Sequence, residues 1–159
     1  KPAGKPAAKP AVTTAANGAR ARRYWLFKSE PESYSFAQFE RDGRTFWHGV
    51  RNYQARNLLR DESQVGDGVL FYHSNEGLEI VGLAKVIKEA YPDPTDEGDT
   101  WSVVDLKPVK KLKKPVTLAS IKAELRLKDI QLLRLNRLSV ISLTPDEFGM
   151  LIDMSQTKI

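Results

Sequence analysis

The stretch YWLFKSEP, at residues 24–31, decides the fold, because the amino-acid composition of the sequence changes at its first residue. YWLF is a short apolar run rich in aromatic side chains, which predicts a buried strand, and KSEP is a polar turn at its end. Residues 1–23 contain six Lys or Arg, no acid and repeated Lys-Pro pairs. Such a segment has almost nothing to bury, so we predict a disordered basic tail at 1–23 and a single domain at 24–159.

The net charge of +5 is concentrated in that tail. Of the 25 Lys and Arg, six lie in residues 1–23, which leaves 19 in the domain against 20 Asp and Glu. A nucleic-acid partner therefore requires a local basic surface on the domain, the tail, or both. The tail itself is either a phosphate-binding arm that adds salt-sensitive affinity or a solubilising extension.

Outward from the first strand, the sequence alternates short apolar runs with turn residues. We predict a turn followed by a strand at 66–74, strands at 80–90, 101–109 and 138–143, a loop at 91–99, and a basic loop, KKLKKP, at 110–115. Helices are expected from Ser35 to near Gly43, from Asn52 to Glu62, from Thr117 or Ser120 through Leu125, and after Thr144. Ser35 with Gln38, and Thr144 with Pro145 and Glu147, have the spacing of capping boxes. The order predicts an α+β fold: a small curved β-barrel of mainly antiparallel strands with peripheral helices.

Several chemistries are excluded or disfavoured by what the sequence lacks. There is no Cys, so disulfides, thiolate metal sites and a Cys nucleophile are ruled out. The two His, His48 and His73, have no zinc-site spacing, and the acids of 93–99 lack the EF-hand pattern. No G-x-S-x-G or Walker-type motif is present. No apolar run approaches the roughly 18 residues that a membrane-spanning helix requires. We therefore expect a non-enzymatic protein with no cofactor, metal or membrane partner.

Three segments place polar side chains beside aromatic ones: KSEP at 28–31, WHGVRNYQARN at 47–57 and FYHSN at 71–75. An extruded base needs flat apolar faces around its ring and hydrogen-bonding groups at its edge. The aromatic candidates for the faces are Trp25, Trp47, Tyr53 and Tyr72. The polar candidates for the edge are Ser29, Asn52, His73 and Ser74.

Each candidate also has a purely structural interpretation. A Trp within a strand is usually core, so we expect Trp25 and Trp101 to be chiefly core and Trp47, beside Gly49, to line the pocket. His73 is expected to be a hydrogen-bonded structural residue. The residues predicted to contact the nucleic-acid backbone are Arg22, Arg23 and Arg56, with Arg51 holding a flanking phosphate or stacking on a base.

The segments YWLFKSEP, WHGVRNYQARNLLR, GDGVLFYHS, IVGLAKVIKEAYPDPT and RLSVISLTPDEF, in this order, closely resemble the EVE domain family. The resemblance covers residues 24 to about 154. It implies a PUA-like fold related to the YTH readers of modified adenosine. It also implies binding of a modified base, with 5-methylcytosine or 5-hydroxymethylcytosine in DNA, or a modified RNA base, as ligands.

The resemblance further implies a set of pocket residues. Lys28, Ser29 and Glu30 would come from the KSEP turn. Trp47 would form an aromatic wall. The remaining polar and aromatic contacts would come from Arg51, Asn52, Tyr72 and Ser74, with Arg137 and Ser139 approaching the same mouth.

We therefore predict a monomeric module that accepts an extruded, modified base, located in the cytoplasm, with nucleoid association in a bacterium and a nuclear location in a eukaryote. Two alternatives stay open. One is an enzyme or accessory domain of RNA modification, with Glu30 or His73 transferring a proton. The other is a small-molecule or nucleotide sensor that uses the same pocket.

Overall fold

The computed structural model describes residues 22–47, 52–74, 77–96, 98, 100–135 and 138–157. Within these residues, six strands form one sheet in the order β2-β5-β4-β3-β1-β6. The strands are β1 (Tyr24–Ser29), β2 (Thr45–Phe46), β3 (Gly68–His73), β4 (Glu79–Pro92), β5 (Ser102–Thr117) and β6 (Val140–Leu143). The β1–β3 pair is parallel and the other pairs are antiparallel.

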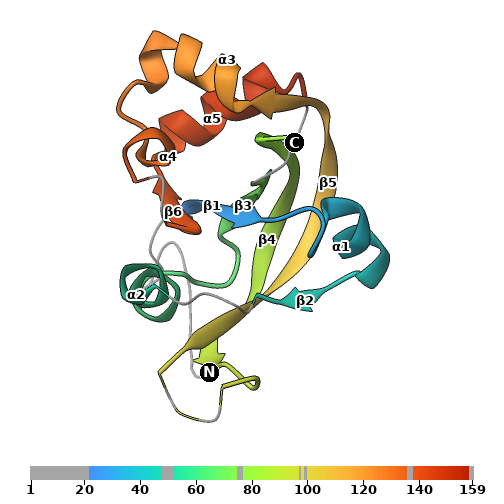
Figure 1. Cartoon of the computed structure of the whole chain (residues 1–159), viewed down its shortest axis with the longest axis vertical. Helices are drawn as coiled ribbons and strands as arrows, with labels where there is room; N and C mark the ends of the chain where they lie inside the picture. The colour runs from blue at the N-terminus through green and yellow to red at the C-terminus, as the bar shows by residue number, and fades with distance from the viewer. Residues whose placement is uncertain are drawn as a thin grey trace.

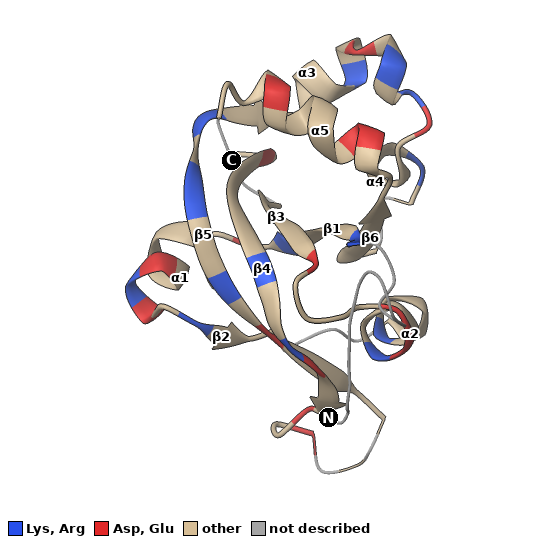
Figure 2. Cartoon of the chain, turned by 180° about the vertical axis from the view of Figure 1, so that it is seen from behind, with Lys and Arg blue, Asp and Glu red and all other residues tan. Residues whose placement is uncertain are grey.

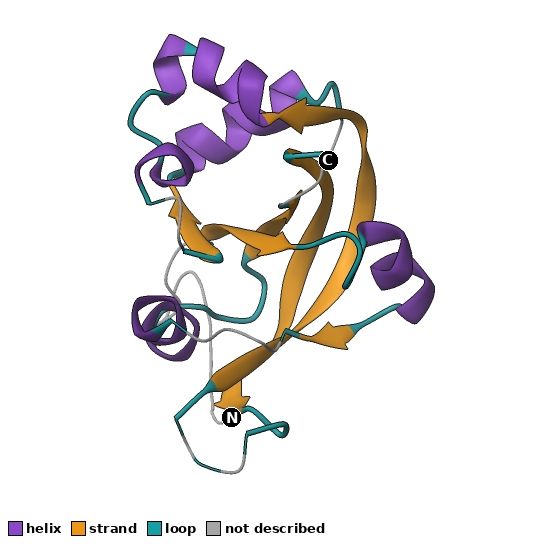
Figure 3. Ribbon diagram, in the orientation of Figure 1, coloured by secondary structure: helices purple, strands orange, loops and turns teal. Residues whose placement is uncertain are grey.

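The long strands β4 and β5 run side by side along the molecule and give the sheet its strong curvature (Figure 1). Three helices gather at one end: α3 (Leu118–Ala123), α4 (Gln131–Arg134) and α5 (Pro145–Met154), with a 3-10 turn at Leu125–Leu127 (Figure 3). The other two, α1 (Phe36–Asp42) and α2 (Tyr53–Asp61), lie on opposite sides of the molecule. The predicted α+β fold is confirmed, although the sheet is curved and open rather than a closed barrel.

The helix starts follow local capping chemistry. Thr144 forms a complete capping box with Glu147, as its sequence predicts. Ser35 accepts a hydrogen bond from the backbone of Gln38, but the Gln38 side chain turns to Asp42 instead of returning to the cap. The α1 capping box is therefore half formed.

The core is built on aromatic side chains of the central strands. Trp25, Phe27 and Phe71 are fully buried. The indole Nε1 of Trp25 donates to Asp67 at 2.9 Å, so the buried ring and the buried carboxyl satisfy each other. Trp25 is thus a core residue, as expected, whereas Trp101 is only half-buried and lies outside the core cluster.

The prediction of a basic loop at 110–115 is wrong, because this segment continues strand β5 to Thr117. From Lys107 onward β5 pairs, among the described strands, with β4 alone, since β2 reaches no further than Leu106. An edge strand tolerates Lys and Pro because one row of its backbone groups is not needed for pairing. Strand β4 also extends to Pro92, into the segment predicted as a loop.

Candidate functional site

The parallel pairing of β1 and β3 brings the KSEP turn beside the end of FYHS. Lys28 lies opposite Tyr72, and Ser29 lies opposite His73. The Ser74 amide donates to the Ser29 carbonyl at 2.9 Å, and the Lys28 amide donates to the Ser139 carbonyl at 2.9 Å. Parts of the chain that are far apart in sequence therefore meet at one end of three adjacent strands, where polar side chains gather.

Successive side chains of a strand point to opposite faces of the sheet, and this divides the predicted pocket residues. Ser29 and His73 share a face with Phe27 and Phe71, as the 5.6 Å distance between the Phe71 and His73 rings shows. Lys28 and Tyr72 point to the other face. The structure therefore separates two pairs that the sequence analysis places in one pocket.

Trp47 belongs to the face of Ser29 and His73. Its ring centroid lies 5.5 Å from that of Phe27 and 5.4 Å from that of Phe71, and Tyr34 lies edge-on at 6.5 Å. The Trp47 amide donates to the Val104 carbonyl at 2.8 Å, which ties the ring to strand β5. With 7 % of its surface exposed, Trp47 is largely buried by these rings.

The polar groups on this face are fixed by hydrogen bonds. The Ser29 hydroxyl donates to the Tyr34 carbonyl at 2.6 Å, and His73 Nε2 accepts from the Phe36 amide at 3.1 Å. Burial lowers the pKa of His73, although the nearby Glu79 carboxylate partly opposes the shift. A neutral imidazole that accepts at Nε2 carries its proton on Nδ1, so His73 is fixed in one tautomer. Its structural role, as expected from the sequence, is to hold the start of α1.

Lys28 and Tyr72 lie on the opposite face of the sheet, where Tyr72 is buried with Leu26 and Leu70 in the core cluster. Lys28 is half-buried, and burial lowers the pKa of its ammonium group. Burial likewise raises the pKa of Tyr72. Glu30 is exposed, and its carbonyl accepts from the Ser33 and Tyr34 amides, so its backbone shapes the turn after β1.

Asn52 and Arg56 lie at the start of α2 and within it. The Asn52 side chain accepts from the Ala55 amide at 3.1 Å and caps the helix, which lies across the molecule from α1 (Figures 1 and 2). Arg56 lies 4.9 Å over the Tyr53 ring and donates to the Thr100 carbonyl. Tyr53, 62 % exposed, stacks on Trp101 at 5.1 Å. Tyr53 therefore lies with Trp101 and Arg56.

The predicted backbone-contacting arginines are not equivalent. Arg22 is exposed at the start of the described chain. Arg23 pairs with Glu62 at 2.8 Å and lies 5.0 Å over the Trp25 ring, so it anchors strand β1. Arg51 and Arg137 lie outside the described residues.

One basic surface was missed by the sequence analysis. The exposed lysines of β5 form a row along the sheet edge, which we call the β5 lysine row: Lys107, Lys110, Lys111, Lys113 and Lys114 (Figure 2). The buried Leu106, Leu112 and Val116 are separated by even numbers of residues, as expected for one face of a strand. This spacing is the sequence signal that could have shown that β5 continues through the lysines.

Within the part of the chain that the structure describes, no cluster of three or more His, Asp or Glu is placed to hold a metal ion. Over the same residues, no helix combines the length and apolar character needed to cross a bilayer.

The sequence matches the EVE domain family over residues 23–154. Thymocyte nuclear protein 1 of Gallus gallus is 36% identical over 169 residues, covering 85% of this chain and 69% of its own length. A solved protein of Agrobacterium tumefaciens has a TM-score of 0.81 with 42% identity, over 84% of this chain and 92% of that one.

A second solved relative was crystallised with DNA. Human THYN1, in complex with DNA containing 5-methylcytosine, has a TM-score of 0.78 and 34% identity, over 86% of this chain and 99% of that one. A YTH domain of Zygosaccharomyces rouxii, at 13% identity and a TM-score of 0.57 over 87% of this chain and 89% of that one, shares the fold alone. The expected likeness to the YTH fold is therefore confirmed.

Proposed function

This chain belongs to the EVE domain family, and from that premise we propose that it is a nucleic-acid-binding module that accepts a modified base. The observation that carries the proposal is the placement of Trp47 on the face of Ser29 and His73, at the strand end where β1 and β3 meet. The complex of human THYN1 with 5-methylcytosine-containing DNA supports this ligand class.

In this proposal, aromatic side chains contact the faces of the base and polar groups contact its edge. An extruded base stacks on aromatic side chains, for which Trp47 is the candidate, and its edge hydrogen-bonds to polar groups. The fixed tautomer of His73 and the Ser29 hydroxyl are the polar candidates on this face, with Ser74 at the strand end. Lys28 and Tyr72 lie on the other face of the sheet, and the exposed Glu30 follows Ser29 in the turn after β1.

The expected preference for a modified base is modest. One additional methyl group in an apolar pocket contributes about 1–3 kcal/mol, which is roughly a 10- to 200-fold preference. We propose 5-methylcytosine or 5-hydroxymethylcytosine in DNA as the first ligands to test, and a modified RNA base as the next. A monomeric state and a cytoplasmic location stay predictions; the name of the vertebrate relatives supports a nuclear location for a eukaryotic form.

The test compares duplexes that differ in a single cytosine, unmodified, 5-methylated or 5-hydroxymethylated, by measuring the dissociation constant at two salt concentrations. The modified duplex should bind more tightly at both. Trp47→Ala should abolish the difference. Trp101→Ala is the matched control, because this Trp stacks on Tyr53 outside the core cluster that contains Trp47, and its loss should leave the preference intact.

Trp47 also packs in the core, so a second variant guards against misfolding. Ser29→Ala removes a hydroxyl without creating a large cavity, and should reduce the preference while thermal unfolding stays cooperative. Equal affinity for all three duplexes in the wild-type protein would refute base reading. Formation of a new product from the nucleic acid, lost in Glu30→Gln, would indicate an enzyme instead.

A further inference from the structure

The β5 lysine row is a second surface whose composition points to an anionic ligand. Residues 107–117 contain five Lys and no Asp or Glu. All five lysine side chains are exposed, and the segment forms the edge of the sheet. The domain as a whole is close to neutral, so this is a local concentration of positive charge.

The β4 residues opposite Lys107, Lys110 and Lys111 carry no carboxylate, and Glu79 lies opposite Thr117 at the far end of the segment. Lys111 pairs with Gly82, Lys110 with Leu83, and Lys107 with Lys85. The ion pairs found among the described residues involve arginines, and Lys107, Lys111, Lys113 and Lys114 take part in none of them. Like charges opposite each other on a sheet repel, and a bound polyanion relieves that repulsion.

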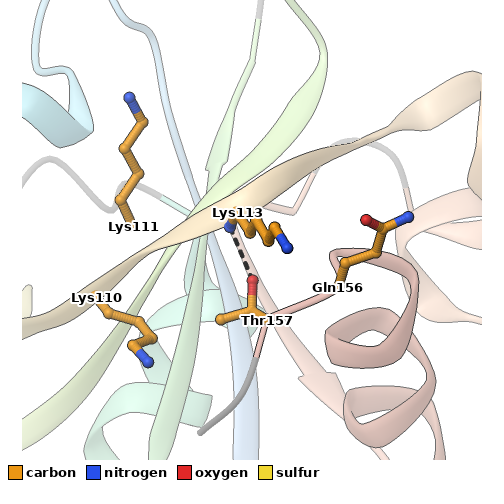
Figure 4. A pocket seen from close by; sticks show the side chains of 5 residues that line it. All are labelled: Lys110, Lys111, Lys113, Gln156 and Thr157. Atoms are coloured by element: carbon orange, nitrogen blue, oxygen red, sulfur yellow. Dashed lines mark hydrogen bonds between the residues drawn. The ribbon is translucent and has the colours of Figure 1, made fainter.

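The lysine side chains of the β5 lysine row do not converge on a single point. Lys110, Lys111 and Lys113 surround an open hollow of about 290 Å³ that is completed by Gln156 and Thr157. In Figure 4 the three ammonium groups point in different directions, while Thr157 accepts from the Lys113 amide at 2.8 Å. This arrangement suits a series of phosphates better than a single one.

The length of the row fits a nucleic-acid backbone. Lys107 pairs with Lys85 and Val116 pairs with Ile80, so this irregular part of β5 spans roughly 17 Å of β4 at about 3.3 Å per residue. Duplex DNA carries about one negative charge per 1.7 Å of its axis, so that length spans many phosphates.

The row also lies near the candidate base site. Phe71, which contacts Trp47, pairs with Gly82 on β4, and Gly82 pairs with Lys111 on β5. With strands about 4.8 Å apart, the Phe71 and Lys111 backbones are separated by roughly 10 Å. A strand whose base reaches Trp47 can therefore extend its neighbouring phosphates along β5.

We propose that the β5 lysine row binds the phosphodiester backbone of the DNA whose base the domain reads. This assignment rests on the proposed function for its ligand. It replaces Arg23 and Arg56 as the main backbone contacts, because both are held within the protein by hydrogen bonds and aromatic stacking. The contact is independent of sequence and of base modification.

The experiment compares two triple variants with the same loss of charge. The test variant is Lys107→Gln, Lys111→Gln and Lys113→Gln. The matched control is Lys122→Gln, Lys128→Gln and Arg134→Gln, which removes three exposed cations from the helical end of the molecule. Dissociation constants for modified and unmodified duplexes are measured across a series of salt concentrations.

Each lost phosphate contact reduces the slope of log affinity against log salt by about 0.9, so the test variant should lose up to about 2.7. Between about 50 and about 200 mM salt, the wild-type protein should then lose about 40-fold more affinity than the test variant does. The control should keep a slope near that of the wild-type protein. The ratio between modified and unmodified duplexes should be unchanged in both variants.

The possible results separate the explanations. Equal slopes in the two triple variants would overturn the proposal. Unchanged affinity accompanied by aggregation of the test variant would also overturn it, and would show that the lysines only prevent edge-to-edge pairing. Loss of binding to phosphatidylserine vesicles with intact DNA binding would assign the row to a membrane surface instead. A reduced slope with no modification preference, even in the wild-type protein, would support the row and refute base reading.

Discussion

Gly82 allows strand β4 to pass directly beneath the ring of Phe36. A Cβ atom at this position would lie 2.2 Å from two atoms of that ring, well inside van der Waals contact. Because Phe36 is itself buried between α1 and the sheet, it has little room to move. We expect Gly82→Ala to lower the free energy of unfolding by about 1–3 kcal/mol, measured by urea denaturation.

Gly149 provides the comparison for that substitution. It lies within α5, and a Cβ there would meet no atom within 4 Å. Gly149→Ala should therefore stabilise the protein by up to about 1 kcal/mol, through helix propensity. Two substitutions of the same kind should change stability in opposite directions, and a neutral Gly82→Ala would show that Phe36 is free to move aside.

For single residues, the sequence indicates the kind of role that a side chain can play better than it indicates which distant residues surround that side chain. Trp47 could be singled out because it stands in a polar, glycine-containing segment, and it lies on the face of Ser29 and His73. Trp101 could not be distinguished from a core Trp, since its half-buried position depends on Tyr53 from a distant helix. Asn52 has the composition of a base contact, but a helix cap requires the same side chain.

One tyrosine side chain, that of Tyr34, extends from just before helix α1 to the last residue of the helix. The Tyr34 hydroxyl, ahead of the helix, donates to the Asp42 carboxylate at its last residue, at 2.8 Å. Burial is the largest cause that raises the pKa of Tyr34, to about 12 from an ordinary value of 10.0; a hydrogen bond with Thr45 opposes the shift, and Asp42 adds to it. The folded state therefore holds this proton more tightly than the unfolded state.

That shift predicts how stability responds to alkali. A raised pKa in the folded state contributes stability that is complete below the unfolded pKa and is lost as the pH approaches the folded one. The stability difference between wild type and Tyr34→Phe should thus stay constant below pH 10.0 and shrink between there and about pH 12. Urea denaturation at several pH values measures it.

Asp42→Asn separates the two causes of the shift. Burial is the larger cause and survives this substitution, so most of the pH dependence should remain. The assignment would be contradicted by a stability difference that does not change with pH over this range. It would also be contradicted if Asp42→Asn removed the pH dependence completely.

Elements differ in how far their local sequence decides them. The start of α5 could be predicted because Thr144 and Glu147 satisfy each other's hydrogen bonds and Pro145 suits the first position of a helix. The second half of β5 could not, because Lys and Pro have low strand propensity and the segment depends on its partner β4. The two faces of the site were merged for a similar reason: the parallel pairing of β1 with β3 is a long-range contact.

For the whole molecule, the distribution of charge suggests that affinity and selectivity are separable. Residues 1–22 contain five Lys or Arg and no acid, so their deletion lowers the net charge from +5 to zero. We expect this deletion to weaken binding to modified and unmodified DNA equally and to reduce the salt dependence, because the contacts are electrostatic. Fluorescence anisotropy with both duplexes measures the affinity and the ratio.

A chain of full length with the same five cations replaced by Gln controls for tail length. It should behave as the deletion does. If the deletion changed the preference for the modified base, the tail would have to contact the base itself, and the division of roles would be wrong.

The position of β1 has a consequence for synthesis on the ribosome. Leu26 pairs with Leu70 on one side and with Ile141 on the other, so the first of the described strands along the chain is completed by the last of them. Contacts between such distant segments form slowly and leave apolar edges open in the meantime. The nascent chain must therefore keep the Trp25–Phe27 strand from pairing with other polypeptides until nearly the whole domain has been translated.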